Sequence, residues 1–540
     1  MNRRSFLRHS AVGAFAGVVG SMAGGCCLSP RSEAPAPLGV GSEVVEEGSV
    51  AELQRGLMSG RLTAVGLTKA YLQRIERLDH NGPRLKSVIE LNPDALAIAA
   101  ARDRERKDRG ARGPLHGLPI LIKDNINTHD RMATTAGSLA LAGSVTPHDA
   151  ALVARLRAAG AVILGKTNLS EWANFRGSRS ISGWSGRGGQ TRNPYVVDRS
   201  PSGSSSGSAC AVSASLCAVA IGTETDGSIV SPAAYCGVVG LKPTRGLVCR
   251  AGIIPIAASQ DTAGPLARTV ADAAAFLGVM TGVAGRDSAT KTSADRAYSD
   301  YVRFLDARVL RGARLGVPRS LFKLHPRVDQ AMEAALEAMR REGAELIESV
   351  QMPPRRDVAD TEYQLMLYEF KAGLNAYFAS LGRAAPVKSM KDLIGFNEQH
   401  REEELPFFGQ EILIEAEAKG PLTDPAYLEA RARCVQWSRR LETLLEEQRL
   451  DAIVAPTGGP AHTLDLINGD RGLGGSSTYA AVAGLPNITV PCGDLCGLPL
   501  GMSFFGRAWS EPRLLAMAYA FEQATRFRKP PRFLPTLDLA

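Results

Sequence analysis

The chain of 540 residues is long enough to bury a large hydrophobic core, within one large domain or several smaller ones. Its hydrophobic fraction of 44% and charged fraction of 22% are those of an ordinary globular protein and exclude a disordered or fibrous chain. The formal net charge is +8, but Lys and Arg are scattered instead of forming a basic stripe interleaved with aromatic residues, so no nucleic-acid partner is expected.

The first 48 residues differ in character from the rest. Residues 2–8 (NRRSFLR) form a twin-arginine motif, and the apolar run that follows, residues 11–25, is shorter than the roughly 18–20 residues of a membrane span. We therefore expect a twin-arginine signal peptide at residues 1–26, a flexible linker at 27–48, and export to the periplasm or cell envelope. Two outcomes stay open: ordinary signal cleavage, or a lipoprotein with a lipid anchor on Cys26 or Cys27.

From Ser49 onward, apolar spacing predicts helices alternating with strands, which is typical of a layered α/β fold. The predicted helices cover residues 50–78, 93–109, 149–159, a turn within 166–175, a helix from 269, then 327–342, 427–447 and 511–524. The predicted strands cover residues 115–126, 161–164, 253–256, 314–317, 344–350, 451–456, 488–491 and 500–505. Residues 360–419, rich in charge with Phe, Tyr and Leu interspersed, are expected to form helices that wall or cover a site.

The most informative stretch is residues 198–247. Two loops of small residues, 200–208 and 223–228, flank an apolar segment at 209–221. Small side chains let the backbone approach a ligand closely. The second loop also presents consecutive N–H groups, which stabilising an oxyanion requires. Hydroxyl groups beside free amides indicate acyl-transfer chemistry with a serine nucleophile.

This stretch resembles the amidase signature family in three linked blocks: SGSSSGSA (202–209), GTETDGSIVSPA (222–233) and GVVGLKPT (237–244). GLPILIKDNI, SQDTAGPLARTVADAA and DAIVAPT extend the resemblance to roughly residues 50–525. The resemblance implies an α/β fold: a single α/β/α layered domain, residues 49–530, around a large, mixed, twisted sheet. It implies no metal and no cofactor.

The same resemblance implies a Ser–cisSer–Lys triad. Ser228 matches the nucleophile, Ser204 the bridging serine with a cis peptide bond to Gly203, and Lys123 the catalytic lysine. To act as a base, Lys123 must be neutral, so its pKa must fall from about 10.4 to about 7–8. Burial at the end of the apolar strand can supply that shift.

The backbone amides of Thr225, Asp226, Gly227 and Ser228 match the family's oxyanion hole. Asp226 stands where the family commonly has Gly, and a carboxylate near an oxyanion would be unfavourable. We therefore expect this carboxylate to point away from the hole.

Trp172 and Asn174, upstream of the signature, stand where substrate contacts are plausible. Packing of the loop explains both residues equally well. Seven cysteines lie beyond the leader, and because the number is odd they cannot all pair with one another, so their disulfide state stays open.

The block GTETDGSIV, with Asp226 and Val230 in place of the common Gly and Arg, most resembles peptide amidases within the family. This implies hydrolysis of the C-terminal amide of peptides, with release of ammonia through an acyl-enzyme. The expected partner is a small-molecule or peptide amide substrate, with no obligate protein partner. One alternative is an amidase of other acylamides or of aryl amides and esters.

A remote alternative is an α/β-hydrolase esterase, because Gly203-x-Ser205-x-Gly207 fits the pattern of a nucleophile elbow. Its triad would need one of His325, His400 and His462. Such an elbow follows directly on a buried strand, and the preceding residues VVDRSPS are a poor strand.

Overall fold

The central strands are apolar on both sides. Every residue of β2 (Pro119–Lys123), β3 (Val162–Thr167), β6 (Ala220–Glu224) and β11 (Ala452–Pro456) is buried. Because successive side chains of a strand point to opposite faces, both faces of the sheet must be covered, which gives the predicted α/β/α layering. This computed structural model describes residues 42–383 and 385–538, and the expected signal peptide with Cys26 and Cys27 lies outside them.

Within the described residues, one 11-stranded mixed sheet carries the core. Its order is β1 (Val88–Leu91), β3, β2, β6, β8 (Thr262–Ala267), β7 (Val239–Lys242), β12 (Asn487–Leu495), β13 (Leu498–Phe505), β11, β9 (Arg314–Gly316) and β10 (Glu345–Ile347). Strand β2 pairs in parallel with β3 and β6, and β9 pairs in parallel with β10 and β11. The other neighbours are antiparallel, so the sheet is mixed as predicted. A short ribbon of β4 (Trp184–Ser185) and β5 (Gly189–Gln190) stands apart.

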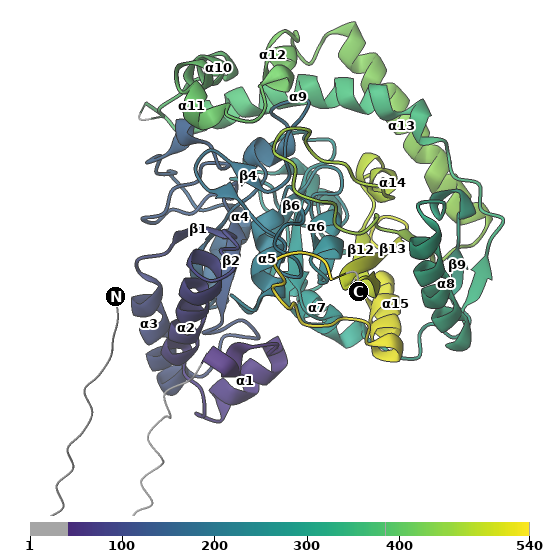
Figure 1. Cartoon of the computed structure of the whole chain (residues 1–540), viewed down its shortest axis with the longest axis horizontal. Helices are drawn as coiled ribbons and strands as arrows, with labels where there is room; N and C mark the ends of the chain where they lie inside the picture. Colours follow the sequence, from purple (N-terminus) through teal and green to yellow (C-terminus); the bar gives the residue numbers. More distant parts are fainter. Residues whose placement is uncertain (1–41, 384, 539–540) are drawn as a thin grey trace, which may run out of the picture. The chain divides into compact units, whose positions relative to one another are not determined.

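Several α-helices pack against this sheet, and those of residues 359–417 form an arc beyond it (Figure 1). The α-helices of the described residues are α1 (Val50–Met58), α2 (Ala64–Arg74), α3 (Ala95–Arg109), α4 (Ala151–Ala158), α5 (Ser206–Ser213), α6 (Val230–Tyr235), α7 (Val270–Met280), α8 (Pro326–Arg341), α9 (Ala359–Ser380), α10 (Met390–Gln399), α11 (Arg401–Glu404), α12 (Glu411–Glu417), α13 (Pro425–Glu447), α14 (Ser477–Val482) and α15 (Glu511–Thr525). Ser49, Thr63 and Thr269 begin α1, α2 and α7 by accepting a backbone N–H with their hydroxyl oxygens.

The predicted strand at residues 253–256 is wrong. These residues form a loop, in which Ile253 makes an isolated β-bridge to Ile126. Conversely, β8 escaped prediction because Gly264 and Pro265 are typical of turns. The glycine is required there, since a Cβ would lie 1.9 Å from the carbonyl oxygen of Leu241 on β7.

The end of the expected linker belongs to the folded body. Val45 is fully buried within a 3₁₀ turn, and Glu46 pairs with Arg74 at 2.9 Å. Glu47 forms a second ion pair, with Arg528 near the C-terminus. The folded body therefore includes residues 45–47, which precede residue 49, the predicted beginning of the domain.

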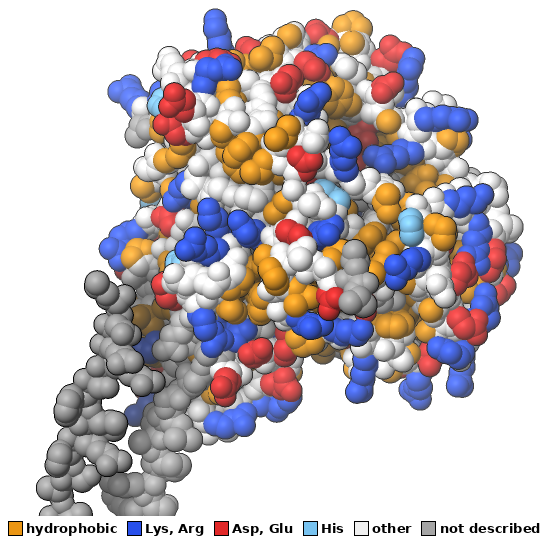
Figure 2. Space-filling view, in the orientation of Figure 1, with side chains coloured by type: hydrophobic (Ala, Val, Ile, Leu, Met, Phe, Trp, Pro, Cys, Tyr) orange, Lys and Arg blue, Asp and Glu red, His pale blue; other side chains and the backbone are white. Residues whose placement is uncertain are grey.

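The surface carries mixed charge. On the face drawn in Figure 2, Lys and Arg side chains are interspersed with Asp and Glu, and hydrophobic side chains lie between them. Met58 and Ile467 are among the large apolar side chains exposed at the surface, and such exposure is ordinary for a folded protein. In the part of the chain that the structure describes, every helix is too short or too polar to cross a membrane.

Residues 359–417 form a helical layer, the cover, with a hydrophobic cluster of its own. Apolar side chains of α9, α10 and α12 pack there with Trp172 and Phe175, which precede the signature stretch. The cover is fastened by Arg176, whose buried guanidinium donates to Glu171 Oε1 at 2.6 Å and to the carbonyl of Glu404 at 2.6 Å.

We predict that Arg176→Ala lowers the free energy of unfolding by about 3–5 kcal/mol, because it leaves buried carboxylates without their cation. Urea titration of both proteins measures the difference. Arg440→Ala is the control: its ion pair with Asp357 is about half exposed, so its loss should cost at most about 1 kcal/mol. Equal midpoints for wild type and Arg176→Ala would contradict this account of the cover.

Candidate active site

Lys123 ends β2 with its side chain fully buried. Its Nζ lies 2.7 Å from Ser204 Oγ, 3.1 Å from Ser205 Oγ and 2.8 Å from Thr223 Oγ1. Burial lowers the pKa of Lys123 to about 7, although Glu224 and Asp261 oppose the shift. The amine is therefore substantially neutral near pH 7, as the sequence predicts for a base.

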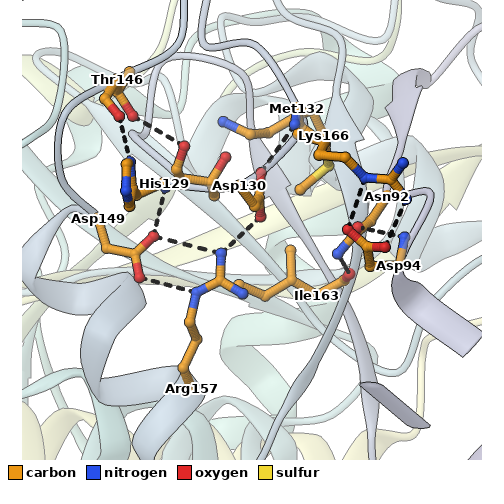
Figure 3. Close-up of polar contacts among 12 residues, drawn as sticks. Asn92, Asp94, His129, Asp130, Met132, Thr146, Asp149, Arg157, Ile163 and Lys166 are labelled. Carbon is orange, nitrogen blue, oxygen red and sulfur yellow. Dashed lines mark hydrogen bonds and ion pairs between the residues drawn. The ribbon is translucent and has the colours of Figure 1, made fainter. Parts of the chain in front are cut away.

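The chain just beyond Lys123 is held rigidly. Figure 3 shows Arg157 of α4 bonded to Asp149 and Asp130, and the backbone of His129 donating to Asp149. Lys166, from the neighbouring strand β3, donates to the carbonyl of Ile126 at 2.6 Å. These contacts fix the loop after β2 and thereby the position of the lysine at the end of that strand.

Ser204 lies fully buried in the loop before α5, and its peptide bond to Gly203 is cis, as predicted. Its carbonyl accepts the amide of Ser170 at 3.1 Å. Gly203 has no room for a side chain, because a Cβ would lie 2.1 Å from Ser170 Oγ. Close packing of small residues thus sets the hydroxyl of Ser204 against Lys123.

Ser228 lies in the turn between β6 and α6 and is 8% exposed. Its carbonyl accepts the amide of Ser205 at 3.1 Å, so the two signature loops meet at this point. Gly227 adopts a left-handed φ of 78°, which favours glycine. Glu224 holds the turn by accepting the amides of Ile229 at 2.7 Å and Val230 at 3.1 Å.

The predicted oxyanion loop, residues 225–228, contains backbone amides that are available to a ligand. Within residues 42–383 and 385–538, no acceptor bonds to the amides of Asp226, Gly227 and Ser228. The carboxylate of Asp226 is engaged elsewhere: it accepts the hydroxyls of Ser477 at 2.5 Å and Thr478 at 2.7 Å, at the start of α14. As predicted, the carboxylate therefore points away and leaves the amides to a ligand.

A cavity of about 450 Å³ opens beside this loop. Its lining includes Thr223 and Thr225, residues 250–256 and Tyr377 of α9. The cover predicted for residues 360–419 thus does wall the cavity. The wall at 253–256 is the loop that sequence patterning took for a strand.

Trp172 and Asn174 lie beside the cavity, whose lining includes the intervening Ala173. Trp172 is 1% exposed and packs edge-on against Phe378, so it belongs to the core of the cover. Asn174 is half-buried, with a left-handed φ of 71°. The geometry favours packing for Trp172, and substrate contact by Asn174 stays a prediction.

Ser205 is a poor nucleophile in this geometry. It is fully buried and donates its hydroxyl to the carbonyl of Thr223 at 3.0 Å, and a loop precedes it where an elbow needs a strand. The histidines proposed as its partners contact other groups: His325 caps α8, His400 stacks on Phe396 and His462 contacts Asp470.

Among the described residues, no group of three or more His, Cys, Asp or Glu side chains is arranged to hold a metal ion. The seven cysteines beyond the leader are free thiols. The sulfurs of Cys210 on α5 and Cys236 after α6 lie 3.7 Å apart.

Sequence reasoning missed three polar residues of the site. Asn125, two residues after Lys123, donates to Thr223 Oγ1 at 3.0 Å. Asp261 accepts the hydroxyl of Thr225 at 2.6 Å. Glu362 of α9 accepts a hydrogen bond from Gln260, and burial raises its pKa to about 8. Asn125 lies two residues after Lys123, so the sequence could have indicated it as a site residue. Asp261 and Glu362 reach the site only through long-range packing.

The lysine leaves a signature in stability. Because the pKa of Lys123 is about 7 in the folded protein and 10.5 ordinarily, the unfolded chain binds more protons between these values. Stability contributed by this site therefore rises with pH across that window, by about 1.4 kcal/mol per pH unit. We predict that the free energy of unfolding of wild type, relative to that of Lys123→Met, rises by about 1.4 kcal/mol per pH unit between pH 7 and 10, as measured by urea unfolding. Parallel profiles would contradict a buried, neutral lysine.

Comparison with known proteins agrees with this geometry. The family described as Amidase matches residues 66–515. A probable amidase of Arabidopsis thaliana is 43% identical over 91% of this chain and 92% of its own. Native peptide amidase from Stenotrophomonas maltophilia is 56% identical, with a TM-score of 0.86 over 90% of this chain and 99% of its own. Peptide amidase PAM in complex with the competitive inhibitor chymostatin is likewise 56% identical, with a TM-score of 0.87 and the same coverage of both chains. The chain belongs to the amidase signature family and is an amidase, a hydrolase of carbon–nitrogen bonds.

Proposed function

We propose that this protein is a peptide amidase that removes the C-terminal amide of peptides and releases ammonia. The observation that carries the proposal is the 2.7 Å contact between the buried Nζ of Lys123 and Ser204, beside an open cavity. The similarity to peptide amidases at 56% identity supports the substrate class.

In the proposed first step, Ser228 Oγ attacks the carbonyl carbon of the terminal amide. Its proton passes to Ser204, whose own proton passes to neutral Lys123. The negative charge that develops on the carbonyl oxygen is held by the amides of the loop 225–228, which have no acceptor within the described chain.

In the second step the proton returns through Ser204 to the amide nitrogen, and ammonia leaves. An acyl-enzyme remains on Ser228, and water hydrolyses it with the same lysine as base, releasing the peptide as a free acid. A pKa of about 7 suits Lys123 to both directions, because a base and its conjugate acid are then both populated near neutral pH.

The cavity suits the acyl side of a peptide. Its wall includes the apolar residues 253–256 and the ring of Tyr377, while Asn125 and Thr225 supply polar groups near the reacting carbonyl. A pocket of this volume, which combines apolar residues with polar and charged groups such as Glu224 and Arg250, can enclose a small ligand. Peptide amidase PAM binds the competitive inhibitor chymostatin, which supports the proposal that the cavity of this protein receives the acyl side of a peptide substrate.

The alternative is an amidase of other acylamides or of aryl amides and esters. The same triad serves both functions, so the size of the acyl group distinguishes them. A substrate that leaves the cavity empty forgoes the binding energy that a peptide would gain there.

The first experiment measures ammonia release from a C-terminally amidated dipeptide, with acetamide and an aryl ester beside it. We predict turnover of the peptide amide and little of acetamide. Ser228→Ala should lose at least about a thousandfold in kcat, and Lys123→Ala at least about a hundredfold.

Ser205→Ala is the matched control, because its hydroxyl lies 3.1 Å from the same lysine yet has no place in the relay. It should retain far more activity than Ser228→Ala. Ester hydrolysis that survives Ser228→Ala and Lys123→Ala but stops in Ser205→Ala would overturn the mechanism. Equal kcat/KM for acetamide and the dipeptide amide would favour the broader amidase.

We also propose that the protein is exported by the twin-arginine route, to the periplasm or as a lipoprotein of the cell envelope. The support is the sequence NRRSFLR at residues 2–8, with an apolar run behind it. Such a location suits an enzyme that scavenges external peptide amides.

Replacing both Arg3 and Arg4 by lysine should retain the protein in the cytoplasm, because the exporter reads the arginine pair. Immunoblots of cell fractions measure this, with Arg8→Lys as the control. If Cys26 or Cys27 carries a lipid, replacing both by alanine should move the exported protein from the membrane to the soluble fraction. An unchanged distribution of the variant that combines Arg3→Lys and Arg4→Lys would refute the proposed route.

A further inference from the structure

Asp261 lies just before β8 and faces the cavity. One carboxylate oxygen accepts the hydroxyl of Thr225 at 2.6 Å. The other accepts the backbone amides of Ile256 at 2.9 Å and Ala257 at 3.0 Å. A single carboxylate therefore joins the first residue of the oxyanion loop to the wall of the cavity.

Gln260, the residue before Asp261, binds the backbone of the same threonine. Gln260 donates its side-chain amide to the carbonyl of Thr225 at 3.4 Å and to Glu362 of α9 at 2.8 Å. Thr225 is thus held through its hydroxyl by Asp261 and through its carbonyl by Gln260. The loop 225–228 is anchored at this end by two consecutive side chains.

Asp261 also contributes charge to the site. Together with Glu224 it stabilises the cationic form of Lys123 against burial. Burial raises the pKa of Asp261 itself to about 6, while Arg250 opposes that rise. Other charged groups lie nearby: Arg250 pairs with Asp287 at 2.7 Å, Glu362 is bonded to Gln260, and Arg286 also lines the cavity.

We propose that Asp261 is a positioning residue of this active site, which holds the oxyanion loop through Thr225 and supplies negative charge to the surroundings of Lys123. The inference rests on the proposed function, since it assigns a role to Asp261 within the same relay. It assigns no contact with the reacting atoms.

Two consequences follow from the geometry. Without the Thr225 tie, the amides of the loop can shift from the position of the oxyanion, and misplacement by about 1 Å can cost about a hundredfold in rate. Without the negative charge, protonated Lys123 is less stable, so its pKa falls below about 7. Neutral Lys123 then persists to lower pH.

The test compares three variants by pH profiles of kcat and kcat/KM with the amidated dipeptide. Asp261→Asn removes the charge, and its single oxygen can accept from the amides of Ile256 and Ala257 or from the hydroxyl of Thr225, but not from both as the carboxylate does. Thr225→Val removes the hydroxyl and keeps the carboxylate. Asp261→Glu keeps the charge and displaces it by one methylene group.

For Asp261→Asn we expect kcat to fall about tenfold to a hundredfold, with the acid limb of kcat/KM shifted to lower pH. Thr225→Val should lower kcat with a smaller shift of the acid limb. Asp261→Glu should lower kcat while its acid limb stays near that of wild type. A purely structural role would lower activity in all three variants without moving the limb in Asp261→Asn.

Asp261→Asn with kcat within twofold of wild type, or with reduced kcat and an unmoved acid limb, would overturn the proposal. Thermal unfolding shows whether each variant is folded. If Asp261→Asn fails to fold, the other two decide: wild-type kcat in both would overturn it. Wild type and Ser228→Ala, assayed in parallel, separate the failures: absence of ammonia release by wild type would refute the proposed function, whereas full activity of Ser228→Ala would refute the relay in which Asp261 is given its role.

Discussion

The site depends on burying one lysine among neutral polar groups. Lys123 is surrounded by hydroxyl and carbonyl groups, and burial brings its pKa to about 7. A buried ammonium is costly unless it is paired, so the folded protein favours the neutral amine. The proposed base is thereby neutral in part near pH 7, at an expense of stability that grows as the pH falls from 10.5 and is complete below about pH 7.

The composition around the lysine follows from this constraint. The hydroxyl of Ser204 has to reach a fully buried amine, so the loops of the signature must pack closely, and only small residues permit that. Gly203 lacks room for a Cβ, and Gly227 adopts a left-handed conformation at the turn before Ser228. The abundance of Ser and Gly reflects close packing of two loops rather than flexibility.

Acidic groups surround the oxyanion loop, yet each is bonded to groups other than the free amides of Asp226, Gly227 and Ser228. Asp226 is bonded to hydroxyls of α14, Glu224 to amides that begin α6, and Asp261 to Thr225 and the cavity wall. The charges of Glu224 and Asp261 still act over distance on Lys123, while the oxygens of all three carboxylates fix the backbone that carries the free amides. Glu362 of the cover accepts a hydrogen bond from Gln260, which also donates to the carbonyl of Thr225. The cover and the oxyanion loop therefore belong to one polar network.

The sequence by itself determined the family and the layered α/β class, and it predicted Lys123, Ser204 and Ser228 as the catalytic residues, because motif spacing and apolar runs are local features. It also indicated that Asp226 must point away, since electrostatics forbids the opposite. Only the tertiary structure decided that β8 is a strand despite Gly264 and Pro265, and that residues 253–256 form a loop walling the cavity. It alone revealed the tie from Asp261 to Thr225, since contacts between residues 36 positions apart depend on how the sheet pairs β6 with β8.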